Sequence, residues 1–327
     1  MRFLVAGGAG FVGSALSRAL LAEAHEVVIY DNFSRGRRDL VPAGAGVTVE
    51  EGDIRDRHHI QRSIAKSRPE VVVHLAALHF IPDCIARPEE ALEINVEGTR
   101  NVFAACTCAS VRGVVFASSA AVYAPSDQAC RELDSPVDPP DIYGETKLRG
   151  EMLAREFHLE TGRDMTMLRI FNVIGPHETN PHVLPQVFEC LRVSNTLMLG
   201  NMEARRDYVH ARDVARAILT VAARSQGLAT YNVGSGRTQS VTEIVELLRR
   251  KLARPVHVKV DPARLRRDDR PVLLADIEKI GRELGWAPEI SMEDTIEELL
   301  RHYKLRQRLR PTRRTAKRRR LRAARPQ

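Results

Sequence analysis

Residues 1–13 read MRFLVAGGAGFVG and decide the fold of this 327-residue chain. Residues 2–6 form a short apolar run, which is typical of a buried parallel strand. Gly7, Gly10 and Gly13 follow at three-residue spacing, and apolar residues then recur at helical spacing. A strand, a glycine turn and a helix in this order predict a dinucleotide site, because the amide groups at the helix start face the pyrophosphate.

A second apolar run, residues 26–30, ends in Asp31. An acidic side chain at this position accepts hydrogen bonds from both hydroxyls of a ribose. The nearby Arg35, Arg37 and Arg38 offer an alternative, since arginines suit the 2′-phosphate that distinguishes NADP. Because the Asp31 carboxylate would repel that phosphate, the sequence favours NAD.

Apolar strands alternate with helices along the first half of the chain, which indicates an α/β protein with a doubly wound parallel sheet. The further strands are expected at residues 47–51, 70–77, 113–119 and 165–171. Helices are expected at 55–66, 89–109, 142–161, 184–191, 210–223 and 241–252, and from residue 291. Prolines and histidines mark residues 176–185 as a loop. We therefore expect a dinucleotide-binding domain, a smaller and partly interleaved C-terminal substrate domain, and a basic tail, at residues 1–171, 172–302 and 303–327.

The net charge of +8 belongs to the tail. From Arg301 onward there are 13 lysines and arginines and no acidic residue, so residues 1–300 carry a net charge of −5. Runs of one charge are typical of disorder and permit contact with nucleic acid or an acidic surface, with nonspecific stickiness as the simpler interpretation. We expect deletion after Tyr303 to change neither fold nor turnover.

No apolar run reaches the ~18 residues that a membrane span requires. No secretory leader precedes the strand that begins at Arg2, so we expect a cytoplasmic protein. The five scattered cysteines fit small buried side chains in a reducing compartment, and we expect no metal site.

Tyr143 and Lys147 lie four residues apart on an expected helix and so share one face. A phenol with a pKa near ~10 is a poor base at neutral pH. A nearby ammonium group favours the phenolate, so we expect Lys147 to lower the pKa of Tyr143. Ser118 and Ser119 end a strand, where an open parallel sheet binds its ligand. The pattern indicates an acid–base centre.

Ten motifs follow one another in a family order: GGAGFVG, DNFSRG, GDI, HLAAL, INVEGT, SSAAVY, YGETK, RIFNVIGP, RRDYVH and YNVGSG. Together they resemble the extended short-chain dehydrogenases/reductases of the NAD-dependent epimerase/dehydratase family, which have a Rossmann fold. The likeness is strongest to nucleotide-sugar 4-epimerases of the UDP-glucose type and extends from Met1 to about Trp286. It implies NAD as cofactor, a UDP-sugar as the favoured substrate, and a homodimer.

The resemblance also implies the site residues. The catalytic residues would be Ser119, Tyr143 and Lys147. The NAD-binding residues would be Gly7, Gly10, Phe11, Val12, Gly13, Asp31, Asn32, Asp53, Ile54, Leu75, Ala76, Ala77, Asn95, Tyr143 and Lys147. The substrate-binding residues would be Ser119, Tyr143, Asn172, His182, Arg206, Arg266, Arg270 and Leu273. Arg266 and Arg270 compete for one diphosphate-binding position, for which a guanidinium group is well suited.

Three departures from the family pattern bear on the reaction. Ala120 and Ala121 stand where related dehydratases carry acidic residues, and elimination of water needs a second acid–base pair. The resemblance therefore implies epimerisation at C4 through a 4-keto sugar. His79 stands where many 4-epimerases carry a lysine near the nicotinamide ribose. The sequence therefore does not decide whether NAD stays bound through turnover. Leu273 stands where a large tyrosine excludes an N-acetyl group, so we expect a wider sugar pocket.

Two alternatives follow from the same residues. One is a reductase or dehydrogenase of this fold, in which the cofactor enters and leaves in each cycle. The other is a nucleotide-sensing or nucleic-acid-associated protein that uses the basic tail without catalysis. The intact trio of Ser119, Tyr143 and Lys147 argues against the second alternative.

Overall fold

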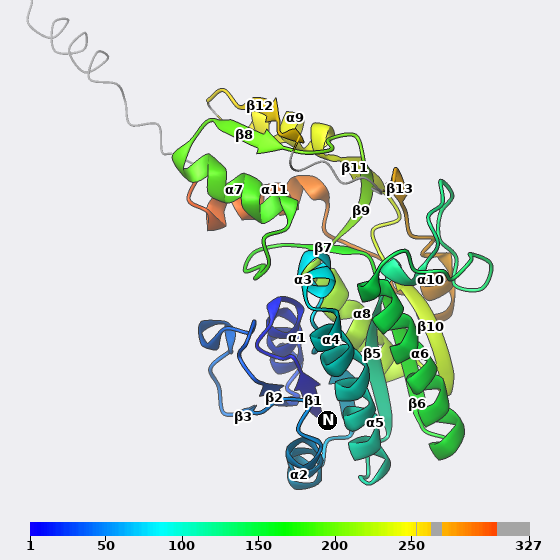
Figure 1. Ribbon diagram of the computed structural model, residues 1–327. Helices are drawn as coiled ribbons and strands as arrows, with labels where there is room; N and C mark the ends of the chain where they lie inside the picture. Colours follow the sequence, from blue (N-terminus) through cyan, green and yellow to red (C-terminus); the bar gives the residue numbers. More distant parts are fainter. Residues whose placement is uncertain (253, 263–269, 306–327) are drawn as a thin grey trace, which may run out of the picture.

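A seven-stranded, all-parallel sheet forms one lobe of the molecule (Figure 1). The computed structural model describes residues 1–252, 254–262 and 270–305. The strands stand in the order β10–β6–β5–β4–β1–β2–β3. In chain order they are β1 (Arg2–Ala6), β2 (Glu26–Asp31), β3 (Val47–Glu51), β4 (Val71–His74), β5 (Gly113–Ser119), β6 (Asp164–Ile170) and β10 (Leu228–Val233).

The strand order reverses beside β1. The chain runs outward from β1 to β2 and β3, then returns to place β4 on the other side of β1. Loops that leave neighbouring strands in opposite directions open a crevice at the carboxyl edge of a parallel sheet. The sheet therefore places the ends of β1 and β4 on either side of a ready-made ligand site.

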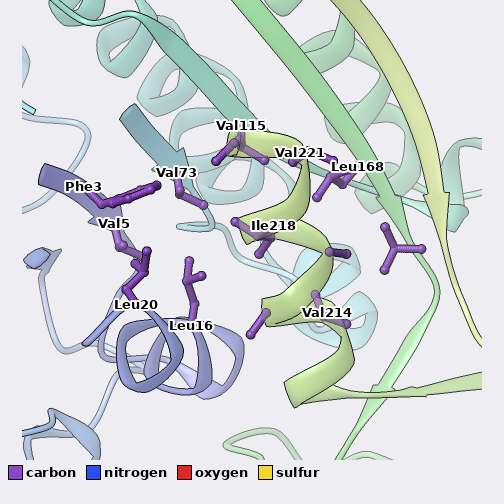
Figure 2. Close-up of a cluster of buried hydrophobic side chains, with 14 of the residues drawn as sticks. Phe3, Val5, Leu16, Leu20, Val73, Val115, Leu168, Val214, Ile218 and Val221 are labelled. Atoms are coloured by element: carbon purple, nitrogen blue, oxygen red, sulfur yellow. The ribbon is translucent and has the colours of Figure 1, made fainter. Parts of the chain in front are cut away.

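Helices cover both faces of the sheet, because alternate residues of each strand point to opposite sides. Phe3 and Val5 face one side, where Leu16, Leu20 and Ile218 pack against them (Figure 2). Leu4 belongs to the buried cluster on the other side. The first face is covered by α1 (Phe11–Ala22) and α8 (Ala211–Arg224), and the second by α2 (Arg57–Ser67), α5 (Gly98–Thr107) and α6 (Ile142–Thr161). Burying such side chains on both faces stabilises the sheet and fixes its carboxyl edge.

The second lobe has its own buried core, with Phe188, Leu248 and Leu300 among its fully buried residues. Its helices are α7 (Val183–Val193), α9 (Val241–Lys251) and α11 (Met292–His302). Its strands are β7 (Asn172–Ile174), β8 (Thr196–Leu199), β9 (Arg205–His210), β11 (Thr238–Ser240), β12 (His257–Val260) and β13 (Val272–Leu273). Between these elements, α8, β10 and α10 (Glu278–Leu284) return to pack on the first lobe (Figure 1).

Several expected boundaries are wrong. The strand expected at 70–77 is β4 and ends at His74, because residues 75–77 turn into the crevice. The helix expected at 89–109 is divided into α4 (Pro88–Leu92), a π-helical turn (Glu93–Glu97) and α5. The helix expected at 55–66 begins at Arg57, since Asp56 caps it by accepting from the amide of His59. The short elements α3 (Ile81–Ala86) and two 3₁₀ turns (Arg38–Leu40 and Ala120–Val122) were not anticipated.

The described residues contain neither a helix with the length and apolarity needed to cross a bilayer nor a cluster of three side chains suited to a metal ion.

Candidate active site

A cleft of about 1060 Å³ is lined by residues from both lobes. Single-ligand pockets are typically ~300–1,000 Å³, so this volume suits a dinucleotide together with a second ligand. Its floor lies where the sheet reverses, with Gly7 after β1 and Leu75 after β4. From there the cleft extends to β9 and β13 in the second lobe, through Arg206 and Leu273.

The glycine turn after β1 is held so tightly that side chains do not fit. Gly7 has φ +82°, and a Cβ there would lie 2.7 Å from the amide nitrogen of Ala76. A Cβ on Gly13 would lie 2.2 Å from the carbonyl oxygen of Gly7. Gly10 differs, because its Cβ would approach only that same oxygen, at 3.3 Å. The chain itself thus requires glycine at positions 7 and 13, whereas at position 10 glycine keeps the cleft open for a ligand.

Asp31 lies buried at the end of β2 and is held by backbone amides. Its carboxylate accepts from the amide of Ala9 at 2.9 Å and from the amide of Phe33 at 2.8 Å. Burial raises the pKa of Asp31, and these two hydrogen bonds oppose that shift. Each carboxylate oxygen keeps a further lone pair, which suits the two hydroxyls of a ribose.

The arginines beside Asp31 are already paired. Arg35 pairs with Asp83, Arg37 with Asp39, and Arg38 with Glu51. The Arg38 guanidinium also lies over the ring of Phe33, with Cζ 4.0 Å from the ring centre. Such exposed pairs are weak and do not decide between NAD and NADP, so the choice of NAD rests on Asp31.

Asn32 and Asp53 form the next part of the cleft wall. Asn32 donates to the Asp53 carboxylate at 2.9 Å, and Arg55 donates to the same carboxylate at 2.7 Å. The hydrogen bonds from Arg55 hold the pKa of Asp53 down at about 2. Asp53 therefore keeps its charge and orients the Asn32 amide beside the cleft.

Asn95 is buried and does not line the cleft. It lies in the π-helical turn, accepts from the amide of Leu78 at 2.7 Å and donates to the Leu78 carbonyl at 2.9 Å. It also donates to the hydroxyl of Thr146 at 3.0 Å. Asn95 thus fixes the loop after β4 to α6, and its contact with NAD stays a prediction.

Tyr143 and Lys147 lie on consecutive turns of α6 and line the cleft with Ser119, which ends β5. The helix begins here because Asp141 caps it, accepting from the amide of Gly144 at 2.9 Å. A hydrogen bond joins the side chains of Ser119 and Tyr143. The Lys147 ammonium donates to the carbonyl of Ala117 at 2.7 Å. The sequence thus placed this trio together correctly.

The expected lowering of the Tyr143 pKa is not observed. Burial raises the pKa of Tyr143, and the hydrogen bond with Ser119 opposes that shift. Burial also acts on Lys147 and lowers its pKa to about 8. An ammonium that titrates so close to neutrality is well suited to an acid–base centre.

Arg206 and Arg270 meet on the second-lobe side of the cleft. Arg206 donates to the backbone carbonyl of Arg270 at 2.7 Å, and Arg270 donates to the carbonyl of Ala121 at 3.3 Å. The Nη1 of Arg270 is buried and has no hydrogen-bond partner. Burial lowers the pKa of Arg270, and the charge of Arg206 acts in the same direction. A buried donor that lacks a partner beside a second guanidinium group fits an anionic ligand such as a diphosphate.

A polar cluster spans the mouth of the cleft. From the first lobe, His79 hydrogen-bonds through Nε2 to the amide of Asn180. From the loop after β7, His182 pairs with Glu178 and lies with its ring 5.4 Å from that of Phe80. Burial lowers the pKa of His79 to about 4 and raises that of Glu178. The sequence singled out His79 and His182 but missed Glu178 and Asn180, because their loop has no periodic pattern.

Ala120 and Ala121 place methyl groups on the wall next to Ser119. Five carboxyl-bearing residues line the cleft elsewhere, and two of them, Asp141 and Glu178, lie outside the NAD-binding part described above and outside α4. Asp141 is committed to capping α6, and Glu178 is bound to His182. The two residues that follow Ser119 therefore supply no acid–base pair to the cleft wall beside Tyr143 and Lys147.

Most expected site residues line this cleft. For the cofactor they are Gly7, Gly10, Phe11, Val12, Gly13, Asp31, Asn32, Asp53, Ile54, Leu75, Ala76, Ala77, Tyr143 and Lys147. For the substrate they are Ser119, Tyr143, Asn172, His182, Arg206, Arg270 and Leu273. Arg266 lies outside the described residues, and so does the tail from residue 306.

Comparisons with known proteins agree with this cleft. A model of the NAD dependent epimerase/dehydratase family matches residues 3–234. The chain belongs to this family. NAD is accordingly its cofactor, as the glycine turn and Asp31 predicted.

Similar proteins include more than one activity. The UDP-glucose 4-epimerase of Corynebacterium glutamicum is 34% identical over 306 residues, which cover 88% of this chain and 91% of that protein. The structure of the Thermotoga maritima UDP-glucose 4-epimerase with UDP-glucose matches with a TM-score of 0.84 and 27% identity, covering 93% of this chain and 99% of that one. DesIV is a dTDP-glucose 4,6-dehydratase from Streptomyces venezuelae solved with NAD and TYD bound. It matches with a TM-score of 0.84 and 30% identity, covering 93% of this chain and 97% of that one. Overall similarity therefore does not separate epimerase from dehydratase in this family.

Proposed function

We propose that this protein epimerises a nucleotide sugar at C4 through a 4-keto intermediate. The observation that carries the proposal is one cleft with Tyr143, Lys147 and Ser119 at its centre and two alanines directly after Ser119. The glycine turn lies on one side of this centre, and Arg206 and Arg270 lie on the other. This arrangement suits a dinucleotide and a nucleotide diphosphate that meet at the trio.

The division of labour follows from the contacts. Arg206 and Arg270 bind the diphosphate and so place the sugar against Tyr143. Tyr143 accepts the proton of the 4-hydroxyl group as a phenolate, the form that the positive charge of Lys147 favours, and returns the proton later, while Ser119 holds the same oxygen. When bound, NAD supplies reversible hydride acceptance at C4. Rotation of the 4-keto sugar within the cleft would then present the opposite face of C4 for reduction.

The alanines favour epimerisation over elimination. Loss of water from a 4-keto sugar needs an acid and a base besides the tyrosine. Ala120 and Ala121 cannot supply them, and Asp141 and Glu178 are engaged in hydrogen bonds. A UDP-sugar is the favoured substrate, because the related epimerases from Corynebacterium glutamicum and Thermotoga maritima are named for UDP-glucose.

The test is turnover of a panel of UDP-, GDP-, CDP- and dTDP-sugars, followed by chromatography and mass spectrometry. We expect interconversion of C4 epimers without change in mass, strongest for a UDP-sugar. Tyr143→Phe should keep its fold and bound NAD but lose at least ~100-fold in turnover, the scale of a lost general base. A dehydrated product, or normal turnover by Tyr143→Phe, would contradict the proposal.

A further inference from the structure

A buried ion pair lies beneath the catalytic face of α6. The Arg169 guanidinium donates to both carboxylate oxygens of Glu151, at 2.9 and 2.8 Å. The two side chains are only 4% and 2% exposed. Desolvating two charges costs several kcal/mol, which their mutual attraction barely offsets, so a buried pair is weak evidence for a role in stability. Its position in the site gives a better explanation.

Glu151 continues the row formed by Tyr143 and Lys147, one helical turn further along α6. The Ser118 hydroxyl donates to Glu151 at 2.6 Å. In the sheet, Ser118 on β5 stands directly opposite Arg169 on β6. The ion pair therefore joins α6, β5 and β6 at the residue that precedes Ser119.

A second link runs parallel to the first. The Lys147 ammonium donates to the carbonyl of Ala117 at 2.7 Å, while Ser118 donates to Glu151. Two consecutive residues of β5 are thus bonded to two consecutive turns of α6. Sliding α6 along β5 would break both links and separate Tyr143 from the end of the strand.

Arg169 is itself held from the far side of the pair. Its Cζ lies 4.7 Å from the centre of the Tyr123 ring. The Tyr123 hydroxyl donates to Asn232 on β10 at 2.7 Å. The guanidinium group therefore lies between Glu151 on α6 and the Tyr123 ring, which is itself hydrogen-bonded to β10, so Glu151 has a well-held partner.

We propose that Glu151 and Arg169 are positioning residues of the catalytic centre, which fix α6 on β5 and hold a negative charge beside Lys147. The inference rests on the proposed function for the roles of Tyr143 and Lys147.

The surroundings of Lys147 show why this charge matters. The titratable groups that face it are Cys84 on α3, His74 on β4, His79 after β4, and Tyr143 and Glu151 on its own helix. Burial raises the pKa of Cys84 to about 11 and lowers that of His74 and His79 to about 3 and 4. These groups are neutral at pH 7, and burial raises the pKa of Tyr143 as well. Glu151 therefore supplies the negative charge that favours the ammonium form of Lys147.

The experiment compares three variants with the wild type. Glu151→Gln removes the charge and keeps the shape of the side chain. Glu151→Leu combined with Arg169→Met replaces the whole pair by apolar side chains, which avoids leaving either charge buried alone. Glu156→Gln removes an exposed carboxylate from the same helix and serves as the control.

Three readouts are taken on each protein: the melting temperature, turnover of UDP-galactose, and the pH dependence of Lys147 acetylation by acetic anhydride, measured by peptide mass spectrometry. In the wild type, labelling of Lys147 should reach half its maximum near its pKa of about 8. In Glu151→Gln this midpoint should move to lower pH, because the carboxylate is lost while the Arg169 charge remains, and in both variants turnover should fall ~10-fold or more. The double variant should melt near the wild-type temperature, and Glu156→Gln should match the wild type in all three.

Wild-type turnover in the double variant together with an unmoved labelling midpoint in Glu151→Gln would overturn the proposal and leave the pair a purely structural role. Failure of the proposed function would look different, because wild type and Tyr143→Phe would then convert UDP-galactose equally. The labelling midpoint of Lys147 tests the role of Glu151 in either case, since it does not depend on turnover.

Discussion

The burial of Lys147 suits its proposed role but lowers the stability of the fold. Its ammonium is buried and donates to the Ala117 carbonyl, and burial lowers its pKa to about 8. A group whose pKa is depressed in the folded state makes folding less favourable while it is charged. The site thus keeps a lysine that lowers the stability of the fold, which is common where activity requires a buried charged group.

Replacing Lys147 by methionine should separate the two effects. Below pH 8 both the folded and the unfolded chain carry the charge, so the full cost of its burial is present. Between pH 8 and the ordinary lysine value of ~10.4, the unfolded chain binds more protons, so wild-type stability gains from rising pH. The melting temperature of Lys147→Met, relative to wild type, should therefore fall as pH rises through this range.

The measurement is calorimetry of NAD-free protein at several pH values on both sides of 8. Turnover by the variant should be reduced at least ~100-fold at every pH. A constant difference in melting temperature across the range would mean that Lys147 titrates in the fold as it does in the unfolded chain.

We propose that Leu273 sets the width of the sugar site. It lines the cleft from β13 and also packs on the cluster around Val122 and Phe171. We expect the wild type to accept UDP-N-acetylgalactosamine and UDP-glucuronate beside UDP-galactose, because leucine lacks the reach of a tyrosine ring. Leu273→Tyr should lower kcat/KM for the larger sugars relative to UDP-galactose by ~10- to 200-fold, the usual range for an apolar wall.

Competition assays with the three sugars measure this ratio directly. Rejection of the larger sugars by the wild type would show that another side chain fills the space. An unchanged ratio in Leu273→Tyr would remove Leu273 from the wall that contacts the sugar.

At the scale of elements, two loops meet over the cleft. The loop after β4 contributes His79 and Phe80, and the loop after β7 contributes Asn180 and His182. The lowered pKa of His79 keeps its ring neutral at pH 7, so it can accept a hydrogen bond from the Asn180 amide. This bond joins the two lobes across the opening.

We expect Asn180→Ala to weaken retention of NAD. The loss of one buried hydrogen bond costs ~1–3 kcal/mol, which corresponds to a ~5- to 150-fold faster release if the bond breaks when the loops part. NAD content after gel filtration, and the release rate after dilution, measure the effect. Gln128→Ala is the control, because it removes an exposed side-chain amide that lies outside both loops. Release at the wild-type rate would mean that the loops do not retain the cofactor.

Local signals predicted some elements well. The boundaries of β5 and α6 agree with the sequence at both ends, since Asp141 caps the start of α6 and Gly162 ends it in a left-handed conformation. Ser240 and Glu243 likewise form the expected capping box at the start of α9. The division of the helix expected at 89–109 was not predictable, because Asn95 bonds to the distant Leu78 and Thr146.

The same contrast holds for the site. The residues on strand ends and on α6 follow from motif spacing, because their geometry is local to one strand or helix. The links made by Glu151, Arg169 and Asn180 depend on contacts between elements far apart in the chain, and no periodic signal marks them. The domain boundaries and the homodimer stay predictions.

At the scale of the whole molecule, the second lobe extends beyond the expected start of the tail at residue 303. Tyr303 stacks on Phe188 with 5.2 Å between the ring centres. Leu305 is buried in the core of the second lobe, and its amide donates to the Leu300 carbonyl at 2.9 Å. A cut after Tyr303 would therefore remove a buried side chain, and the structure favours a boundary after Leu305.

Two truncations test the corrected boundary. Ending the chain after Leu305 should leave melting temperature and turnover unchanged, because residues 306–327 show no apolar periodicity. Ending it after Tyr303 removes Leu305 and should lower the melting temperature by ~2–4 °C per kcal/mol lost. Thermal melts of both proteins decide the matter, and equal melting temperatures would show that Leu305 contributes nothing.

The central claim is that one hydride leaves C4 and returns to C4 within the same cleft. The most direct measurement is incubation of the protein with UDP-galactose that carries deuterium at C4, followed by mass spectrometry and NMR of the product. The account predicts UDP-glucose of unchanged mass, with the deuterium still at C4. A product that has lost one water, that carries the deuterium at another carbon, or that has lost it to the medium would contradict the account.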